Sequence, residues 1–208
     1  MIGYKIAKHG AVSVIVTLEI PTDAQTNMTR SNIAIPETAK YRANKVVVLQ
    51  IEDTAGTCYN TATSCGYSKK SIEYVVGTTI EEPCYNTNIE EVCTEGIHYF
   101  LSRRVAELYT LKSVQNGLFE MWHDNGQLAV NVPYRDGKRE GLFQSWYENG
   151  QKEEEVKFKD GKEYGLCYRW YSNGCKKEES NFKEGKQYGL CKGFYINGLK
   201  CFEVNIIN

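Results

Sequence analysis

The sequence predicts a mainly β protein, in which a small α+β amino-terminal domain precedes an elongated antiparallel β-meander of four 24-residue hairpin repeats. Three observations support this prediction. An aromatic residue followed by an Asn-Gly pair recurs every 24 residues, glycine columns recur with it, and neither pattern reaches into the first half of the chain. A constant period of this length is typical of stacked supersecondary units. We therefore divide the chain into residues 1–112 and 113–208.

The repeat is clearest in the segments "WYENGQK" and "WYSNGCK", which begin at Trp146 and Trp170. Looser copies begin at Trp122 and Phe194. Because equivalent side chains of stacked hairpins lie beside one another, we expect the aromatic and glycine columns to be structural. These columns are Trp122, Trp146, Trp170, Phe194, Gly126, Gly150, Gly174 and Gly198.

Each repeat contains two turn signals. Asn-Gly pairs such as Asn149-Gly150 favour a two-residue type I′ turn, because both residues tolerate positive φ. Asp136-Gly137, Asp160-Gly161 and Glu184-Gly185 are expected to return the chain to the next hairpin. An isolated hairpin is marginal in water, so the hairpins must pair edge to edge and form about eight strands.

Alternation along the first strand of each repeat predicts two different faces. Leucines and the tryptophan column share one face, whereas Phe119, Phe143, Cys167 and Cys191 lie on the other, together with the aromatic column that contains Tyr147, Tyr171 and Tyr195. Stacking within the sheet accounts for most of these columns, and an open apolar face would bind a partner. Tyr147, Tyr171 and Tyr195 are candidate partner-binding residues. Cys167 and Cys191 should stay unpaired, since positions two strands apart are about 9.6 Å apart.

The segment "KCFEVNIIN" is expected to form the second strand of the fourth hairpin and an edge of the sheet. Phe202 occupies the column of Glu154 and Glu178, and Val204 and Ile206 follow it. Unprotected apolar edges attract a further strand. Phe202, Val204 and Ile206 are therefore candidates for docking a second copy or another protein. The alternative is that they pack within their own sheet.

The first half lacks the repeat and reads as mixed structure. We expect strands at 3–7, 12–20, 45–51, 73–78 and 97–101, joined by long polar loops. A helix should begin at Ser102, whose hydroxyl can cap it, and present Val105, Leu108 and Tyr109 to the core.

Charge and cysteine content exclude several classes of protein. Residues 1–112 carry 11 basic and 12 acidic residues, of 25 and 26 in the whole chain, so neither half suggests a nucleic-acid-binding protein or an anionic-membrane partner. The apolar run Ala11–Leu18 alternates as a strand does, which favours an intracellular protein over a secreted one. Cys58, Cys65, Cys84 and Cys93 lack zinc-site spacing, although metal binding by some of them with His98 stays open. We expect no cofactor.

An enzymatic function is a minor hypothesis. Cys93, His98, Glu95 and Glu107 offer the chemical types of a nucleophile, a base and an orienting carboxylate. The sequence contains no nucleophile elbow, phosphate-binding loop or metal-binding histidine pair. We expect that the protein is not an enzyme and that His98 is structural.

The pattern "GLF…WYENGQ…FKDGKEYG", over residues 117–200, resembles MORN repeats, particularly a variant found in bacterial antitoxin-like proteins and in giant DNA viruses. The resemblance implies a sheet of stacked hairpins used for scaffolding, protein contacts or, in some members, membrane association. This chain lacks a regular Tyr-x-Gly-x-Trp core, so lipid binding is not carried over.

In the first half, "GYKIAK", "YRANKVVVLQI" and "CTEGIHYFLSRRVAELY" resemble uncharacterised domains that precede repeat arrays in giant-virus proteins; Cys93–His98 is the most specific part. Together the resemblances imply a non-enzymatic structural or protein-interaction scaffold of a giant virus, located in the host cytoplasm or the virion. The alternatives are a regulatory binding module, antitoxin-like or membrane-recruiting, and an enzyme in the first half.

Overall fold

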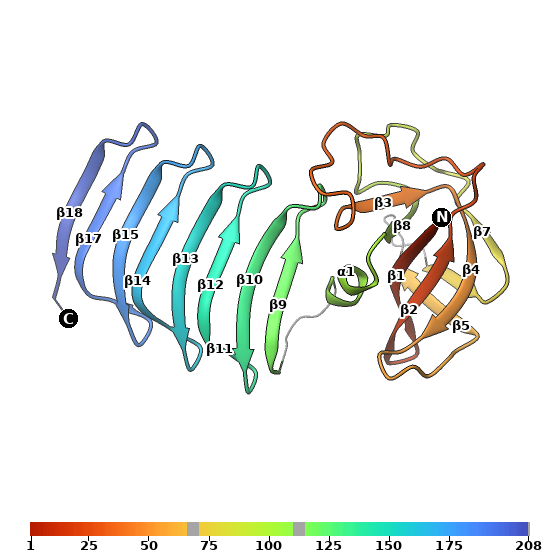
Figure 1. Cartoon of the computed structure of the whole chain (residues 1–208), viewed down its shortest axis with the longest axis horizontal. Coiled ribbons are helices and arrows are strands. Elements are labelled where there is room, and N and C mark those ends of the chain that lie inside the picture. Colours follow the sequence, from red (N-terminus) through yellow and green to blue (C-terminus); the bar gives the residue numbers. More distant parts are fainter. Residues whose placement is uncertain (66–70, 110–114, 208) are drawn as a thin grey trace. The chain divides into compact units, whose positions relative to one another are not determined.

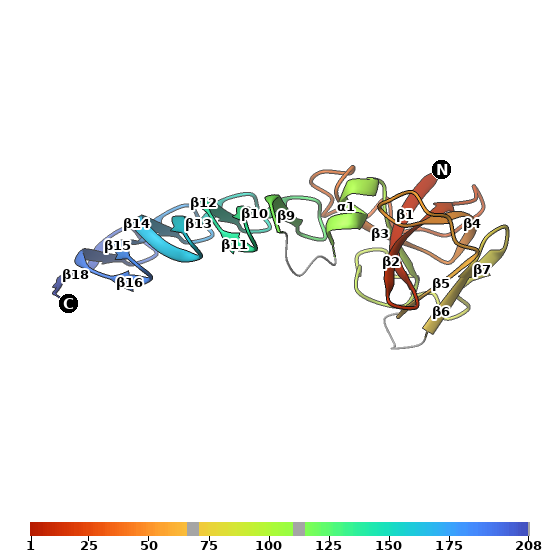
Figure 2. The same cartoon turned by 90° about the horizontal axis from the view of Figure 1, so that it is seen from below.

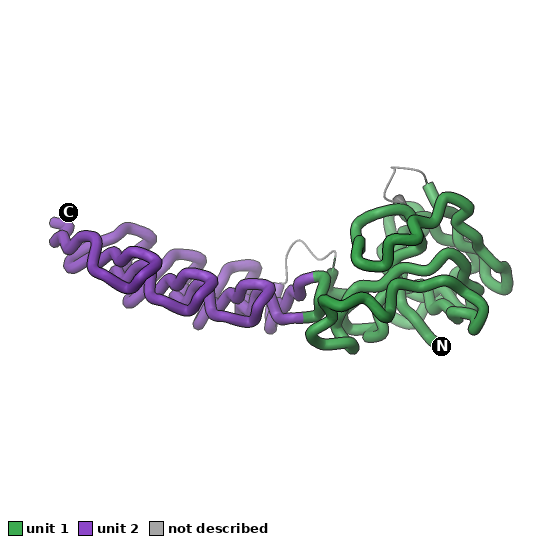
Figure 3. Tube along the Cα trace, turned by 90° about the horizontal axis from the view of Figure 1, so that it is seen from above, with its two compact units in different colours: residues 1–110, 124–126 green, residues 111–123, 127–208 purple. Residues whose placement is uncertain are grey.

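A computed structural model describes residues 1–65, 71–109 and 115–207, which divide into two compact units (Figure 3). Unit 1 comprises Met1–Thr110 and Asp124–Gly126, and unit 2 comprises Leu111–His123 and Gln127–Asn208. The domain boundary predicted at residue 112 falls within 110–114, outside the described residues.

Unit 1 is built on one eight-stranded sheet and a single described helix (Figure 1). The strand order is β3-β8-β1-β2-β4-β7, and β5 pairs with β1 and β6. The elements are β1 (Ile2–His9), β2 (Val12–Glu19), β3 (Lys40–Ala43), β4 (Lys45–Glu52), β5 (Thr61–Cys65), β6 (Ser71–Val75), β7 (Thr79–Glu81), β8 (Ile97–Phe100) and α1 (Arg103–Leu108).

A closed apolar core stabilises unit 1. β-branched residues of β2 and β4, among them Val16 and Val48, are fully buried together with Tyr41, Tyr74 and Tyr99. β1 pairs with β8, which carries Tyr99, and a Cβ on Gly3 would come within 2.6 Å of the Tyr99 ring. The close approach of this ring therefore requires a glycine at position 3.

The five strands predicted in unit 1 are confirmed, with small shifts of their ends. Strands β3, β5 and β7 were not predicted. β3 is fully buried although it contains Lys40 and Arg42. Because these two residues are charged, the sequence pattern does not indicate a buried strand there. The helix begins after Ser102, whose hydroxyl accepts a hydrogen bond from the Val105 amide, as predicted. Val105 is buried, but the prediction for Tyr109 was wrong, because its side chain is 44% exposed.

Unit 2 is a meander of eight long antiparallel strands with two short ones at its turns (Figures 1 and 2). Each long strand pairs with the next along the chain, which confirms the predicted fold class. The strands are β9 (Gly117–Trp122), β10 (Leu128–Arg135), β11 (Lys138–Arg139), β12 (Gly141–Trp146), β13 (Lys152–Lys159), β14 (Lys162–Trp170), β15 (Lys176–Lys183), β16 (Lys186–Gln187), β17 (Gly189–Phe194) and β18 (Lys200–Ile206).

The prediction of type I′ geometry at the Asn-Gly pairs was wrong. At Asn149-Gly150 only the glycine has positive φ, 80°. The Tyr147 amide donates to the Gln151 carbonyl and the Gly150 amide to the Tyr147 carbonyl, both at 2.9 Å. This is a three-residue loop with a glycine in the left-handed region. Asn149 instead uses its side-chain oxygen to accept from the Gln151 amide at 3.0 Å.

Two-residue turns of the type I′ kind occur at the opposite ends of the strands. Asp136 and Gly137 have φ of 50° and 72°, and the flanking residues Arg135 and Lys138 pair directly. Asp160-Gly161 and Glu184-Gly185 repeat this geometry. An acidic residue before glycine therefore marks the tight turn, and Asn-Gly marks the longer loop.

The first Asn-Gly loop belongs to unit 1 by its contacts. The Asp124 carbonyl accepts from Arg30 Nη2 at 2.7 Å and from the Lys40 amide at 3.2 Å. A Cβ on Gly126 would come within 2.1 Å of the Ile35 carbonyl oxygen. Gly126 is therefore required both for its positive φ and for close packing.

Candidate interaction surface

One column of side chains joins each repeat to the next. The Tyr147 hydroxyl donates to the Trp170 carbonyl at 2.8 Å, and the Tyr171 hydroxyl donates to the Phe194 carbonyl at 2.9 Å. His123 Nε2 makes the equivalent bond to the Trp146 carbonyl at 2.7 Å. Two of the three tyrosines predicted to bind a partner thus use their hydroxyls inside the array.

The asparagines of the loops make a second, parallel set of bonds. Asn149 Nδ2 donates to the Ser172 carbonyl at 2.6 Å, and Asn173 Nδ2 donates to the Ile196 carbonyl at 3.0 Å. The loops that contain Asn149 and Asn173 are therefore each held to the following repeat by two side-chain donors. This explains why the spacing stays at 24 residues, because an insertion would separate donor from acceptor.

The face that carries Phe143 and Cys167 is the closed face of the array. Val132, Phe143, Val156, Cys167 and Phe182 form a buried cluster. Arg139, on β11, covers the rings of Phe143 and Phe158 with its guanidinium, 5.3 and 5.1 Å from their centroids. Burial raises the pKa of the Cys167 thiol to about 12, so this thiol is protonated and unreactive.

Farther along the closed face, a polar network replaces the apolar cluster. Arg169 pairs with Glu154 at 2.7 Å and with Glu178 at 3.2 Å. Glu178 also accepts from the Ser180 hydroxyl and from Gln187 Nε2. These side chains satisfy one another within the sheet, so the network is structural.

The opposite face is the open face, and it carries a row of exposed leucines. Leu118, Leu142, Leu166 and Leu190 occupy equivalent positions and are each 40–47% exposed. Equivalent positions lie two strands apart, about 9.6 Å, so the leucines form a regular apolar row. We call these four residues the leucine row. The sequence showed this column but did not show which face was open.

Two lysines of the open face form ion pairs with glutamates of their own strands. Lys152 binds Glu155 at 2.6 Å, and the equivalent pair Lys176–Glu179 is 3.0 Å long. Lys152 also lies over the Trp170 ring, 5.6 Å from its centroid. The tryptophans of this face are half-buried. The open face thus combines the leucine row with ion pairs, and exposed Lys157 lies directly opposite Leu142.

Strand β18 is exposed over most of its length. Phe202 and Val204 are 44% and 46% exposed, Ile206 is half-buried, and Tyr195, before the strand, is 55% exposed. All four are among the residues predicted to bind a partner. Residues of the aromatic column end the strands β9, β12, β14 and β17, and the glycine column lies in the loops, with positive φ.

The groups considered for catalysis each make polar contacts with other residues. Cys93 Sγ donates to the Asp124 carboxylate at 3.2 Å and accepts from Lys40 Nζ at 3.3 Å. Burial raises the pKa of the Cys93 thiol, which disfavours the nucleophilic thiolate. Burial opposes the charge of Lys40, but Asp124 and Tyr109 outweigh it and raise the lysine pKa.

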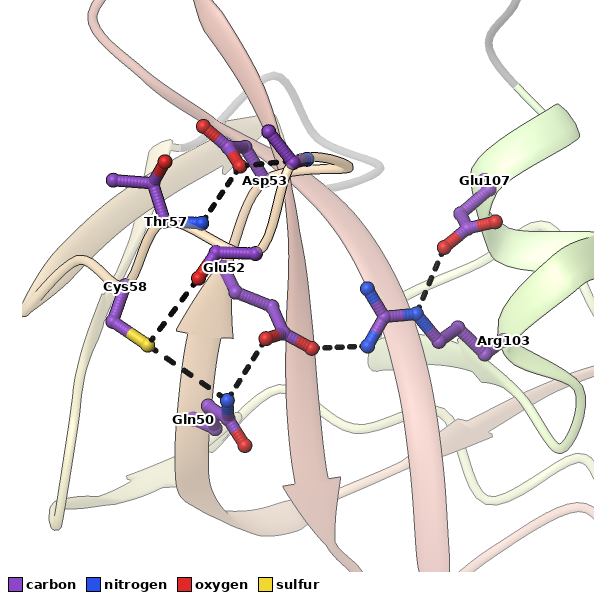
Figure 4. Close-up of polar contacts among 9 residues, drawn as sticks. Gln50, Glu52, Asp53, Thr57, Cys58, Arg103 and Glu107 are labelled. Atoms are coloured by element: carbon purple, nitrogen blue, oxygen red, sulfur yellow. Dashed lines mark hydrogen bonds and ion pairs between the residues drawn. The ribbon is translucent and has the colours of Figure 1, made fainter.

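His98 donates from Nε2 to the Val92 carbonyl at 2.7 Å. Burial and the nearby positive charges lower its pKa to about 4, so it is neutral near pH 7. Glu95 accepts from the Thr94 hydroxyl, and Glu107 pairs with Arg103 at 2.8 Å, which also holds Glu52 (Figure 4). Each of these groups therefore has a separate structural partner.

Among the described residues, no group of three or more His, Cys, Asp and Glu side chains is arranged to hold a metal ion. The described part of the chain also contains no helix long and apolar enough to span a membrane.

Comparison with known proteins supports both halves of this description. Residues 1–106 match the model of a family of unknown function (DUF5758). Residues 115–136 and 139–160 match the MORN repeat variant. The same strand and loop geometry continues through β14 to β18. No curated protein and no solved structure matches the chain. The chain therefore belongs to the DUF5758 family of unknown function, with MORN-variant repeats in its second half.

Proposed function

We propose that the protein is a non-enzymatic scaffold and that the open face of its array binds a protein partner through the leucine row. MORN repeats point to a protein-binding or membrane-associated module. The observation that supports the protein partner is the leucine row, four equivalent side chains that are 40–47% exposed. A periodic apolar row of this kind is an interaction surface rather than scattered surface leucines.

The ion pairs beside the row suit a protein partner. Lysines of the open face such as Lys152 and Lys176 are bound to glutamates of the same strand. A protein partner needs only apolar contact in the centre and a polar rim, which the ion pairs supply.

The test is recovery of native partners by the wild type and by the double variant Leu142→Glu/Leu166→Glu. We expect at least a tenfold loss of the specific partner, followed by the same loss of affinity with the purified partner. Ser172→Glu/Ile196→Glu is the matched control, because it adds two carboxylates at exposed loop positions outside the row. Undiminished binding by the leucine variant, with array melting unchanged, would contradict the proposal.

The alternative functions have separate readouts. Flotation with liposomes would favour a membrane-recruiting scaffold, neutralisation of a toxin would favour an antitoxin-like module, and an activity abolished by His98→Ala would favour an enzyme. The giant-virus origin and the location in host cytoplasm or virion stay predictions from the resemblance. Co-purification with virion proteins tests them.

A further inference from the structure

Val204 is the exposed member of a column that is otherwise buried. The equivalent residues Val132, Val156 and Ser180 are 2%, 1% and 0% exposed, whereas Val204 is 46% exposed. Val132, Val156 and Ser180 lie on strands with neighbours on both sides. β18 pairs with β17, and no other strand of the described residues pairs with its second side. One more strand would bury Val204 as its equivalents are buried.

The last loop repeats the donors that hold the earlier loops together. Tyr195 and Asn197 are equivalent to Tyr171 and Asn173, which donate to carbonyls one repeat further on. Within the described residues no later loop supplies such carbonyls. The Tyr195 hydroxyl interacts with Cys201 instead, and this contact raises the tyrosine pKa. The loop thus carries side-chain donors suited to an added backbone segment.

We propose that β18 of a second copy of this chain is that added strand, paired antiparallel across a two-fold axis. An isologous pairing uses the same edge of both copies and leaves neither edge free. For the closed face to continue from one copy to the next, residues of the same face must lie opposite one another. The two-fold axis must therefore pass through a residue of β18. Which residue lies on the axis decides which side chains of the two copies lie opposite one another.

Among axes at Phe202, Glu203 and Val204, the composition of β18 favours Val204. An axis at Glu203 would place two glutamates directly opposite each other, which is destabilising. An axis at Phe202 would place Lys200 opposite Val204. An axis at Val204 places Val204 opposite Val204, Phe202 opposite Ile206, and Glu203 opposite Asn205.

The register centred on Val204 therefore joins apolar residues on the closed face. It also separates the two Glu203 side chains on the open face. In this register Cys201 lies opposite Ile207. By analogy with the inner repeats, where the tyrosine donates to a carbonyl on the adjacent strand, the Tyr195 hydroxyl would meet the Ile207 backbone of the second copy.

Cross-linking tests both the dimer and its register. In the full chain with Cys201→Ser, the variant Val204→Cys should form a disulfide between the introduced thiols of two copies on mild oxidation, identified by mass spectrometry of the linked peptide. Directly opposed residues have Cα atoms about 4.5–5.5 Å apart, within the range a disulfide needs. Glu203→Cys in the same background is the matched control, and it should link at least tenfold less.

Light scattering gives an independent result without added cysteines. The wild type should approach twice the monomer mass of 23.7 kDa at high concentration, and Val204→Lys should return it to the monomer. Array melting of that variant checks that the hairpin still folds. Equal linking by both cysteine variants, a monomeric wild type at high concentration, or a dimer that survives Val204→Lys would each overturn the proposal.

This dimer is separate from the proposed function. Leu142→Glu/Leu166→Glu alters the open face and should leave the mass unchanged, while Val204→Lys alters the edge. Loss of a partner with an intact dimer, or the reverse, would therefore separate the two proposals.

Discussion

In unit 1, Tyr4 on β1 pairs with Phe100 on β8, whereas every long strand of unit 2 pairs with its neighbour in the chain. Unit 1 has a closed apolar core, and the buried Arg42 donates hydrogen bonds to four carbonyls of the loop at 86–95. Unit 2 exposes one face of its sheet and repeats the same loop-to-loop bonds. The difference implies that unit 1 should unfold as a whole, while damage to unit 2 should depend on how many inter-repeat contacts it removes.

The two units can be followed separately. All three tryptophans, Trp122, Trp146 and Trp170, belong to unit 2, so their fluorescence reports the array. Hydrogen exchange in peptides of residues 1–109 reports unit 1. A loss of stability in one unit can therefore be told from a loss in the other.

The largest effect is expected for Arg42→Met. The fully buried Arg42 guanidinium donates to the carbonyls of Glu91, at 2.8 Å, and of Asn86, Asn88 and Glu95. Its removal takes the shared charged donor away from four part-buried carbonyl bonds, so we expect unit 1 to lose about 3–5 kcal/mol of stability. Hydrogen exchange in peptides of unit 1 measures this. Lys138→Met, at an exposed turn of unit 2, is the control.

A fall in tryptophan-monitored stability equal to the loss in unit 1 would contradict the separation of the two units.

The next effect is a dependence of unit 1 on pH. His98 has a folded pKa of about 4, below its ordinary value of 6.5, because it is buried and lies near Lys40, Lys5 and Arg42. Between these pH values the unfolded chain binds the additional proton, so stability falls as pH drops from about 6.5 to about 4. The loss should reach roughly 3 kcal/mol. Urea unfolding monitored by hydrogen exchange at several pH values measures it.

His98→Gln keeps a donor for the Val92 carbonyl and should flatten this dependence. An unchanged pH profile in that variant would assign the titration to another group.

A smaller effect is expected for Gly150→Val in unit 2. Gly150 has a φ of 80°, and a Cβ there would come within 3.3 Å of the Gln127 side chain. A β-branched residue in this conformation costs about 1–3 kcal/mol. Urea unfolding followed by tryptophan fluorescence measures the loss. The exposed neighbour substitution Glu148→Val is the control, and an equal loss there would contradict the loop geometry.

The smallest effect is expected for Tyr147→Phe, which removes one hydroxyl bond between repeats, 2.8 Å long. We expect a loss of about 1 kcal/mol in tryptophan-monitored unfolding. Tyr195→Phe, measured at low protein concentration, is the matched control, because that hydroxyl contacts Cys201 of its own hairpin and no later loop of the described residues accepts from it. If both variants lose the same stability, the inter-repeat bond is not what the hydroxyl contributes.

The sequence by itself determined the architecture of unit 2, because a constant 24-residue spacing with two turn signals in each repeat favours stacked hairpins. It also located the cap of α1 at Ser102, since capping is a local interaction. Positive φ at the acidic residue of each tight turn was not predicted, because asparagine and aspartate both favour turns and only backbone pairing separates their roles.

Only the tertiary structure decided which face of the array is open. Leu142 and Phe143 are adjacent, both apolar and equally compatible with a strand, yet Phe143 is buried under Arg139 whereas Leu142 is exposed. Phe143 also packs against Val132 and Val156, and Arg139 lies on β11, a two-residue strand beyond the tight turn, so alternation along one strand does not show which apolar residue is covered. In the same way, the sequence did not predict β3, because Lys40 and Arg42 are buried by partners distant in the chain. Identifying the open face therefore required knowledge of long-range contacts, whereas the repeat that carries it could be predicted from the sequence alone.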